Sequence, residues 1–319
     1  MLIEQCLRRY PVYIADIGAS GGIDHRWRQF SSQVRAILFE PDPREFETLR
    51  KTSSDDYIVL NTALSDNSGE IEFYLCRKQQ VSSVFRPNLT FLKMFPEEGR
   101  FDIIGTKKLA TDTLDNQLEM NGITQTDFIK VDTQGYELPI LRGAINSLKD
   151  AIGLEIEVEF SPLYENQPLF SDINDFVVNL GFDLFDIKRY FWKRKDIMNY
   201  GNYRKGQLVF GDALYFRTPE NIISSPNVSE IKIIHSIIVY LAYGYFDLVE
   251  TVSRLAYNNG LLSNDLFSEV LSFLTKSRKN RFLIDFRGKG RIHNIFLKIA
   301  NILSVGGWHS GADKYIGNI

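Results

Sequence analysis

The chain has 319 residues, of which 44% are hydrophobic and 24% are charged, as in an ordinary globular protein with one large domain and an appendage. Its formal net charge of −3 gives no general attraction to phosphate polymers, so we expect no nucleic-acid partner. Only two cysteines are present, no secretory signal opens the sequence and no apolar run is long enough to span a bilayer. We therefore predict a cytoplasmic protein without a transmembrane segment.

Short β-rich runs alternate with helix-like stretches from residue 10 to residue 216. This alternation predicts an α/β fold, with a mostly parallel sheet covered by helices on both faces. The expected strands are residues 12–17, 35–40, 57–64, 71–76, 126–132, 152–160, 182–188 and 207–217. Residues 77–111 and 190–206 follow neither pattern. We predict two irregular inserts there, the first of them a mobile cover over a site.

The pattern changes after residue 217. Prolines punctuate a linker, and residues 228–243, 246–258 and 265–277 carry apolar side chains at helical spacing. We therefore divide the chain into a domain of residues 1–218 and a C-terminal helical region of residues 219–319. Residues 291–303 form an amphipathic stretch with basic flanks, which either packs on its own protein or serves self-association or peripheral contact with a membrane or partner.

A glycine-rich turn between two carboxylates is the most informative feature. The first run ends at Asp16 and Ile17 and leads into Gly18, Gly21 and Gly22, and the second run ends at Glu40. This is the frame of a nucleotide site in which Glu40 holds a ribose, yet neither the dinucleotide nor the P-loop pattern is complete. Asp16 would repel a pyrophosphate but suits a cationic ligand such as S-adenosylmethionine. The residues alone leave open a methyl-donor site, a dinucleotide site and a plain tight turn.

A second acidic segment follows another predicted strand. Asp132 stands at the end of the run 126–132, Gly135 lies in the turn beyond it, and Glu137 enters a helix. In open parallel sheets, ligands collect at the carboxyl ends of the strands. We therefore expect Asp132 to face the same crevice as Asp16 and Glu40.

With these segments in place, the chain resembles the FkbM-type methyltransferases, S-adenosylmethionine-dependent enzymes with a Rossmann-like class I fold. Residues 16–19, 22, 39–41, 63–66, 129–138, 141–144 and 155–160 carry the resemblance in matching order and spacing. It covers about residues 10–217 and leaves the helical remainder unexplained. It implies a donor site in which Glu40 binds the ribose hydroxyls. The other implied donor-binding residues are Asp16, Gly18, Ala19 and Gly22 around methionine and ribose, Ala63 and Leu64 beside the adenine, and Asp132.

Methyl transfer to oxygen gains from a base beside the acceptor hydroxyl. The candidate catalytic residues are Asp132, Glu157 and Glu159, and residues 155, 157 and 159 share one face of a strand. Three interpretations stay open for these acids: structural pairing with Lys130, Arg142 or Arg189, a base with a raised pKa, or a Mg²⁺ or Ca²⁺ site made by Asp132 with Glu157 or Glu159. His25 is either an alternative base or a solvated surface residue.

These patterns together predict an O-methyltransferase that acts on a hydroxyl of a glycan, a glycosylated intermediate or a related small molecule. A divalent cation is compatible with the sequence but not required by it, and we assign no residue to a metal. Two alternatives remain: an NAD-dependent sugar-modifying oxidoreductase, and a non-catalytic scaffold with a methyltransferase-like fold. A polar lining suits a hydroxyl-rich acceptor and comprises Ser82, Ser83, Tyr164, Asn166 and Gln167.

Overall fold

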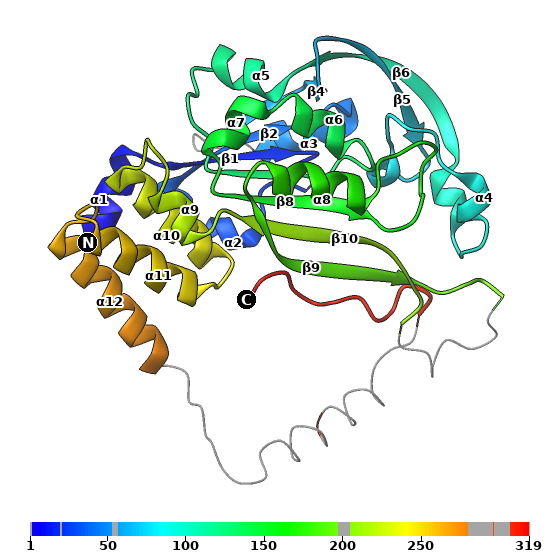
Figure 1. Cartoon of the computed structure of the whole chain (residues 1–319). Helices are drawn as coiled ribbons and strands as arrows, with labels where there is room; N and C mark the ends of the chain where they lie inside the picture. The colour runs from blue at the N-terminus through cyan, green and yellow to red at the C-terminus, as the bar shows by residue number, and fades with distance from the viewer. Residues whose placement is uncertain are drawn as a thin grey trace.

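The computed structural model describes residues 2–19, 21–52, 57–196, 205–279, 296 and 307–318. Its centre is a seven-stranded sheet with helices on both faces (Figure 1), as the sequence predicts. All strand pairs in it are parallel except the two made by β10. In spatial order the strands are β3 (Tyr57–Leu60), β2 (Val34–Phe39), β1 (Val12–Ile17), β7 (Phe128–Val131), β8 (Gly153–Glu159), β10 (Gln207–Phe216) and β9 (Asp183–Trp192).

Two hydrophobic clusters cover the two faces of this sheet. The first joins the sheet to α1 (Leu2–Arg9), α2 (His25–Arg28), α3 (Pro43–Thr52), α9 (Pro219–Ile223), α10 (Glu230–Ala242), α11 (Phe246–Asn258) and α12 (Asn264–Lys279). The second joins it to α5 (Leu114–Met120), α6 (Glu137–Arg142), α7 (Ile145–Asp150) and α8 (Phe170–Asn179). The predicted C-terminal helices are present and pack on the sheet face that the first cluster covers.

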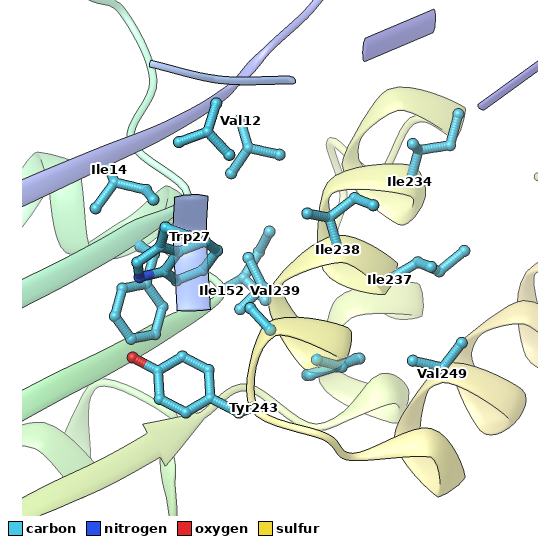
Figure 2. Close-up of a cluster of buried hydrophobic side chains, with 14 of the residues drawn as sticks. Val12, Ile14, Trp27, Ile152, Ile234, Ile237, Ile238, Val239, Tyr243 and Val249 are labelled. Atoms are coloured by element: carbon cyan, nitrogen blue, oxygen red, sulfur yellow. The ribbon is translucent and has the colours of Figure 1, made fainter. Parts of the chain in front are cut away.

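Successive side chains of β1 point to opposite faces of the sheet, so this strand contributes residues to both clusters. Val12 and Ile14 point toward α10 and its neighbours, whereas Ala15 and Ile17 join the opposite cluster. Figure 2 shows Val12, Ile14 and Trp27 of the sheet side meeting residues of α10 such as Val239. Each fully buried aliphatic side chain contributes about 1.5–3 kcal/mol. Burial of this face therefore depends on the C-terminal helices.

A buried polar contact also links the C-terminal helices to the sheet. Glu155 Oε2 on β8 accepts hydrogen bonds from Arg26 Nη1 of α2 at 3.0 Å and from the Tyr243 hydroxyl, just after α10, at 2.7 Å. The Arg26 guanidinium lies 4.5 Å from the centre of the Tyr243 ring. One carboxylate thus joins three elements that are far apart in the sequence.

The structure corrects two predictions near the site. The expected strand 57–64 divides into β3 and β4 (Ala63–Leu64), and β4 joins a separate sheet of order β4-β6-β5. In that sheet, β5 (Gly69–Cys76) pairs with β6 (Ile103–Asp112), so the interpretation of 77–111 as wholly irregular is wrong. Most residues of β6 are exposed, and a strand held mainly by backbone pairing shows no apolar alternation.

The first predicted insert lies within the described residues, and the second lies partly outside them. Residues 77–102 contain the short helix α4 (Leu89–Leu92) and two 3₁₀ turns. The insert expected at 190–206 begins too early, because β9 continues to Trp192, and residues 197–204 lie outside the described part. The amphipathic stretch 291–303 also lies outside it, apart from Phe296.

Candidate active site

The glycine turn after β1 presses against the end of β7. Gly18 has φ +77°, and its amide donates to the Phe39 carbonyl oxygen at 2.9 Å. A Cβ on Gly18 would lie 1.9 Å from the carbonyl oxygen of Asp132. Only a residue without a side chain fits this close backbone approach, which brings the ends of β1, β2 and β7 together.

Glu40 follows β2 at the same edge. Its Oε1 accepts the Asp42 amide at 2.8 Å, and the Asn61 side chain donates to its carbonyl oxygen at 2.8 Å. Burial raises the pKa of the Glu40 carboxyl to about 7, and the negative charges of Asp42 and Glu45 add to this rise against the Asp42 hydrogen bond. A buried carboxylate with one oxygen held by the backbone is well placed to accept hydrogen bonds from a pair of hydroxyl groups.

A cavity of about 270 Å³ opens at this edge and is lined by residues of both sheets. One wall is apolar and includes Ile71, Phe73 and Leu109 of the second sheet, while Glu40 and Asp132 supply acidic groups. Of the predicted donor residues, those that line the cavity are Gly18, Glu40, Ala63, Leu64 and Asp132. The apolar wall suits a flat ring, and the acidic groups suit hydroxyls or a cation.

Three other predicted donor residues, Asp16, Ala19 and Gly22, are not among the lining residues. Asp16 is 4% exposed and lies on the sheet face covered by the C-terminal helices. Lys130 Nζ lies 3.5 Å from Asp16 Oδ1 and 3.7 Å from Asp132 Oδ2, so this lysine bridges the two strands. Burial raises the pKa of Asp16, and the positive charge of Lys130 opposes that rise.

The turn after Asp132 is held by two glutamates. Glu137 Oε1 accepts hydrogen bonds from the Thr133 amide at 2.8 Å, the Thr133 hydroxyl at 3.0 Å and the Gly135 amide at 3.1 Å. Gln134 has φ +59°, and its side-chain amide donates to Glu157 Oε2 at 2.6 Å and to Asp132 Oδ1 at 3.2 Å. Carboxylates on the side of the turn that faces away from the cavity therefore hold the turn in place.

Glu157 and Glu159 lie behind this turn and do not line the cavity. Oxygen atoms of Glu137, Glu157 and Glu159 approach within 4.8 Å of one another, and all three residues are buried. Burial and the negative charge of Asp132 raise the pKa of each, that of Glu137 to about 7, and repulsion from the neighbouring glutamates adds to the rise for Glu157 and Glu159. Asp132 is not part of this group, so the acids that meet differ from the set expected for a cation.

None of the expected basic partners neutralises Glu157 or Glu159. Among the described residues, neither glutamate forms an ion pair, because Lys130 faces Asp16 and Asp132, and Arg189 lies 2.8 Å from Asp313. His25 is also remote, since its side chain is 85% exposed and pairs with Asp24 outside the cavity. Asp132 is therefore the one predicted catalytic residue that lines the cavity.

Sequence reasoning named Lys130 as a partner for Asp132 but missed its contact with Asp16 and the apolar wall. Ile71 and Phe73 alternate with Glu70 and Glu72 along β5, and this period of two was the available signal for a one-sided strand. The contact of Lys130 with Asp16 had no such signal, because it depends on the pairing of β1 with β7. Of the expected polar lining, Ser82 reaches the cavity, while the Tyr164 hydroxyl bonds to Gln134 from behind it.

None of the described helices combines the length and apolar character that a bilayer-spanning segment needs. The sequence matches the family model described as "Methyltransferase FkbM domain" over residues 16–184, more than half of the 319-residue chain. It is also 28% identical over 131 residues to the hexuronic acid methyltransferase AglP of Haloferax volcanii, a match that covers 40% of this chain. The match covers 48% of that protein, so the chain spans about half the length of this relative.

Several solved methyltransferases match the structure at very low identity and with low TM-scores. A TehB-like S-adenosylmethionine-dependent methyltransferase from Corynebacterium glutamicum is 10% identical with a TM-score of 0.30, covering 68% of this chain and 87% of that one. The magnesium protoporphyrin IX methyltransferase of Synechocystis PCC 6803, with bound S-adenosylmethionine, is 7% identical with a TM-score of 0.33, covering 68% and 76%. Similarity this low gives no information about the residues of the site.

The family match, which spans Asp16, Glu40 and Asp132, confirms the resemblance drawn from the motifs. The mostly parallel seven-stranded sheet, in which only the pairs made by β10 are antiparallel, is the arrangement that the resemblance implies, with added C-terminal helices. These findings favour the methyl-donor interpretation of the glycine turn over the dinucleotide one. The chain belongs to the FkbM methyltransferase family.

Proposed function

We propose that this enzyme methylates a hydroxyl group of a glycan or glycosylated intermediate. The observation that carries the proposal is the likeness to a hexuronic acid methyltransferase. The cavity supports it, because Asp132 lines the cavity with a side chain that is 36% exposed. A carboxylate that is reachable from solvent beside the donor can receive the proton of a hydroxyl acceptor.

In this proposal, Glu40 accepts hydrogen bonds from the ribose hydroxyls, and the wall of Leu64, Ile71 and Phe73 packs against the adenine. Gly18 leaves room for the donor to approach the backbone. S-adenosylmethionine, when bound, supplies an electrophilic methyl group that needs no covalent help from the protein. Asp132 orients the acceptor hydroxyl and takes its proton, and such positioning can contribute on the order of 7–11 kcal/mol.

The test is methyl transfer from labelled donor to a panel of oligosaccharides that contain uronic acids, compared with neutral sugars and with small catechols. We expect a labelled glycan and one S-adenosylhomocysteine per product. Asp132→Asn should lower kcat by about 10²–10⁴-fold while the affinity for S-adenosylhomocysteine stays unchanged. Asp102→Asn is the control, because Asp102 is exposed, pairs with Arg77 and does not line the cavity, so kcat and donor affinity should both stay unchanged. Equal losses of kcat and donor affinity in Asp132→Asn would contradict the role of base.

A further inference from the structure

We infer that Glu137, Glu157 and Glu159 form a binding site for one hard divalent cation, behind the turn that lines the donor cavity. Each residue offers one carboxylate oxygen, and these oxygens all lie within 4.8 Å of one another. They come from the start of α6 and from one face of β8, two elements that the core holds rigidly. The site is distinct from the cavity, which neither Glu157 nor Glu159 lines.

The spacing fits a single ion. Calcium binds oxygen ligands at about 2.3–2.6 Å, so two ligands on opposite sides of the ion stand about twice that distance apart. Oxygens that all lie within 4.8 Å of one another can therefore contact the same ion. Mg²⁺ shares the preference for oxygen but requires shorter bonds and a near-octahedral shell, so both ions are compared in the test.

Several carboxylate oxygens of these three glutamates lack a hydrogen-bond partner. Glu159 is 1% exposed, and neither of its carboxylate oxygens makes a hydrogen bond of normal geometry among the described groups, although the side-chain amide of Gln167 lies close enough to lower its pKa. Glu137 Oε2 also lacks a partner, although Oε1 of the same carboxylate accepts three hydrogen bonds. Buried carboxylate oxygens without partners are costly, and a cation would satisfy all of them at once.

The protein itself supplies no compensating charge. Within the described part of the chain, none of the three glutamates forms an ion pair, and the nearby Lys130 is committed to Asp16 and Asp132. Burial and the negative charges of neighbouring acids, Asp132 among them, raise the pKa values of the three carboxyls, so protonated forms are favoured when no cation is bound. Cation binding would displace those protons, so occupancy should rise with pH.

The position of the site indicates what the ion would do. Glu137 holds the amides of Thr133 and Gly135, and Glu157 holds the side chain of Gln134. Thr133 and Gln134 line the cavity. A bound ion would therefore fix both glutamates and stabilise the cavity floor without touching the reacting groups.

The experiment uses the full chain, stripped with EDTA at pH 8, without donor or acceptor. Thermal unfolding is followed with Ca²⁺, with Mg²⁺ or with neither, and bound metal is counted by mass spectrometry after gel filtration. We expect one ion per chain and a rise in Tm of a few degrees, because a ligand that binds only the folded state stabilises it. A response to Ca²⁺ alone assigns a calcium site, and a response to both ions assigns a site that accepts either.

Glu159→Gln should lose both the bound ion and the rise in Tm. This variant removes one charge from a crowded group, so without metal we expect it to unfold no earlier than the stripped wild type. Glu155→Gln is the matched control: it lies on the same face of β8, but a glutamine there can still accept from Arg26 and Tyr243. This control should keep the ion.

Absence of bound metal in the wild type, with the same Tm in EDTA and in Ca²⁺, would overturn the inference and leave the glutamates as a proton-sharing group. Retention of the ion by Glu159→Gln would overturn it as well. Because neither measurement involves methyl transfer, the result is independent of the proposed acceptor.

Discussion

His235 Nδ1 on α10 lies 2.9 Å from Asp127 Oδ2, at the start of β7, and both side chains are buried. The other imidazole nitrogen, Nε2, lies 3.0 Å from the carbonyl oxygen of Tyr10. The imidazole of a C-terminal helix thus sits between two strands of the methyltransferase sheet. This contact fixes α10 at the end of the sheet that is remote from the donor cavity.

Asp127→Ala should lower the free energy of unfolding by about 3–5 kcal/mol, because it leaves buried donors without their acceptor. Asp127 accepts the Tyr13 amide at 3.0 Å and the Gln125 side chain at 2.8 Å, in addition to its contact with His235. Urea denaturation followed by circular dichroism measures the change. Lys108→Ala, which removes an exposed ion pair, is the control and should leave the midpoint unchanged. A small loss for Asp127→Ala would mean that the contact is dispensable.

Asp127 should also make stability depend on acid. Burial alone would raise its pKa, but His235, Lys232 and the Tyr13 amide hold the pKa below its usual value. A carboxyl whose pKa is lower in the folded state stabilises the fold at pH values above its unfolded pKa of about 4. We therefore expect the acid-induced loss of stability below pH 4 to be steeper in the wild type than in Asp127→Asn. Parallel curves for the two proteins would exclude this contribution.

Gly18→Ala should weaken S-adenosylhomocysteine binding by about tenfold or more. The added Cβ would lie 1.9 Å from the Asp132 carbonyl oxygen, so the backbone must move at the cavity wall. Gly21→Ala is the matched control, because Gly21 also has a positive φ, of +82°, yet a Cβ there meets nothing within 4 Å. We expect Gly21→Ala to reduce stability but to keep the affinity, as measured by isothermal titration calorimetry. Equal affinity losses in both variants would attribute the effect to backbone strain alone.

Donor affinity should depend on pH through Glu40. Its pKa of about 7 means that the carboxyl is mostly protonated at pH 6 and mostly ionised at pH 8. If the ionised form binds the ribose hydroxyls, the dissociation constant for S-adenosylhomocysteine should be roughly tenfold higher at pH 6 than at pH 8. Titrations at several pH values measure this slope. Glu40→Gln should bind more weakly and show a flat profile, and a slope that persists in this variant would assign the titration to another group.

A chain that ends at residue 218 should fail to fold as a compact domain. Without the C-terminal helices, Val12, Ile14, Trp27 and Phe128 would lose their cover on one face of the sheet. We expect strong binding of a hydrophobic dye, loss of near-ultraviolet circular dichroism and aggregation. A soluble truncated chain that binds S-adenosylhomocysteine like the full one would show that residues 1–218 form an independent domain.

The main sheet could be predicted because buried parallel strands carry continuous apolar runs. The prediction for β1 rests on such a run, those for α10 and α11 rest on apolar residues at helical spacing, and the structure has all three elements. β6 could not be predicted, because its exposed residues carry no apolar alternation and its pairing with β5 is made by backbone groups. The split between β3 and β4 also lacked a signal, since a change of sheet depends on contacts distant in sequence.

For the site, the sequence predicts which acids stand at strand ends. It does not predict which of them line the cavity and which are enclosed in the protein interior. Asp132 reaches the cavity, whereas Glu157 and Glu159 are enclosed behind the turn of Gln134. That difference depends on the positive φ of Gln134, which directs its side chain between the acids, and on the enclosure supplied by Tyr164. Neither could be derived from spacing along the chain.

The central strands carry two kinds of residue on one face. In β1, Ile14 is followed two positions later by Asp16, and in β7, Phe128 is followed by Lys130. A slip of one residue would put an apolar side chain in the polar half of that face and send a charge into the opposite hydrophobic cluster. The apolar half and the charged half of each strand therefore both fix the register of β1 and β7. We expect that sheets with a shifted register are unstable and do not accumulate during folding.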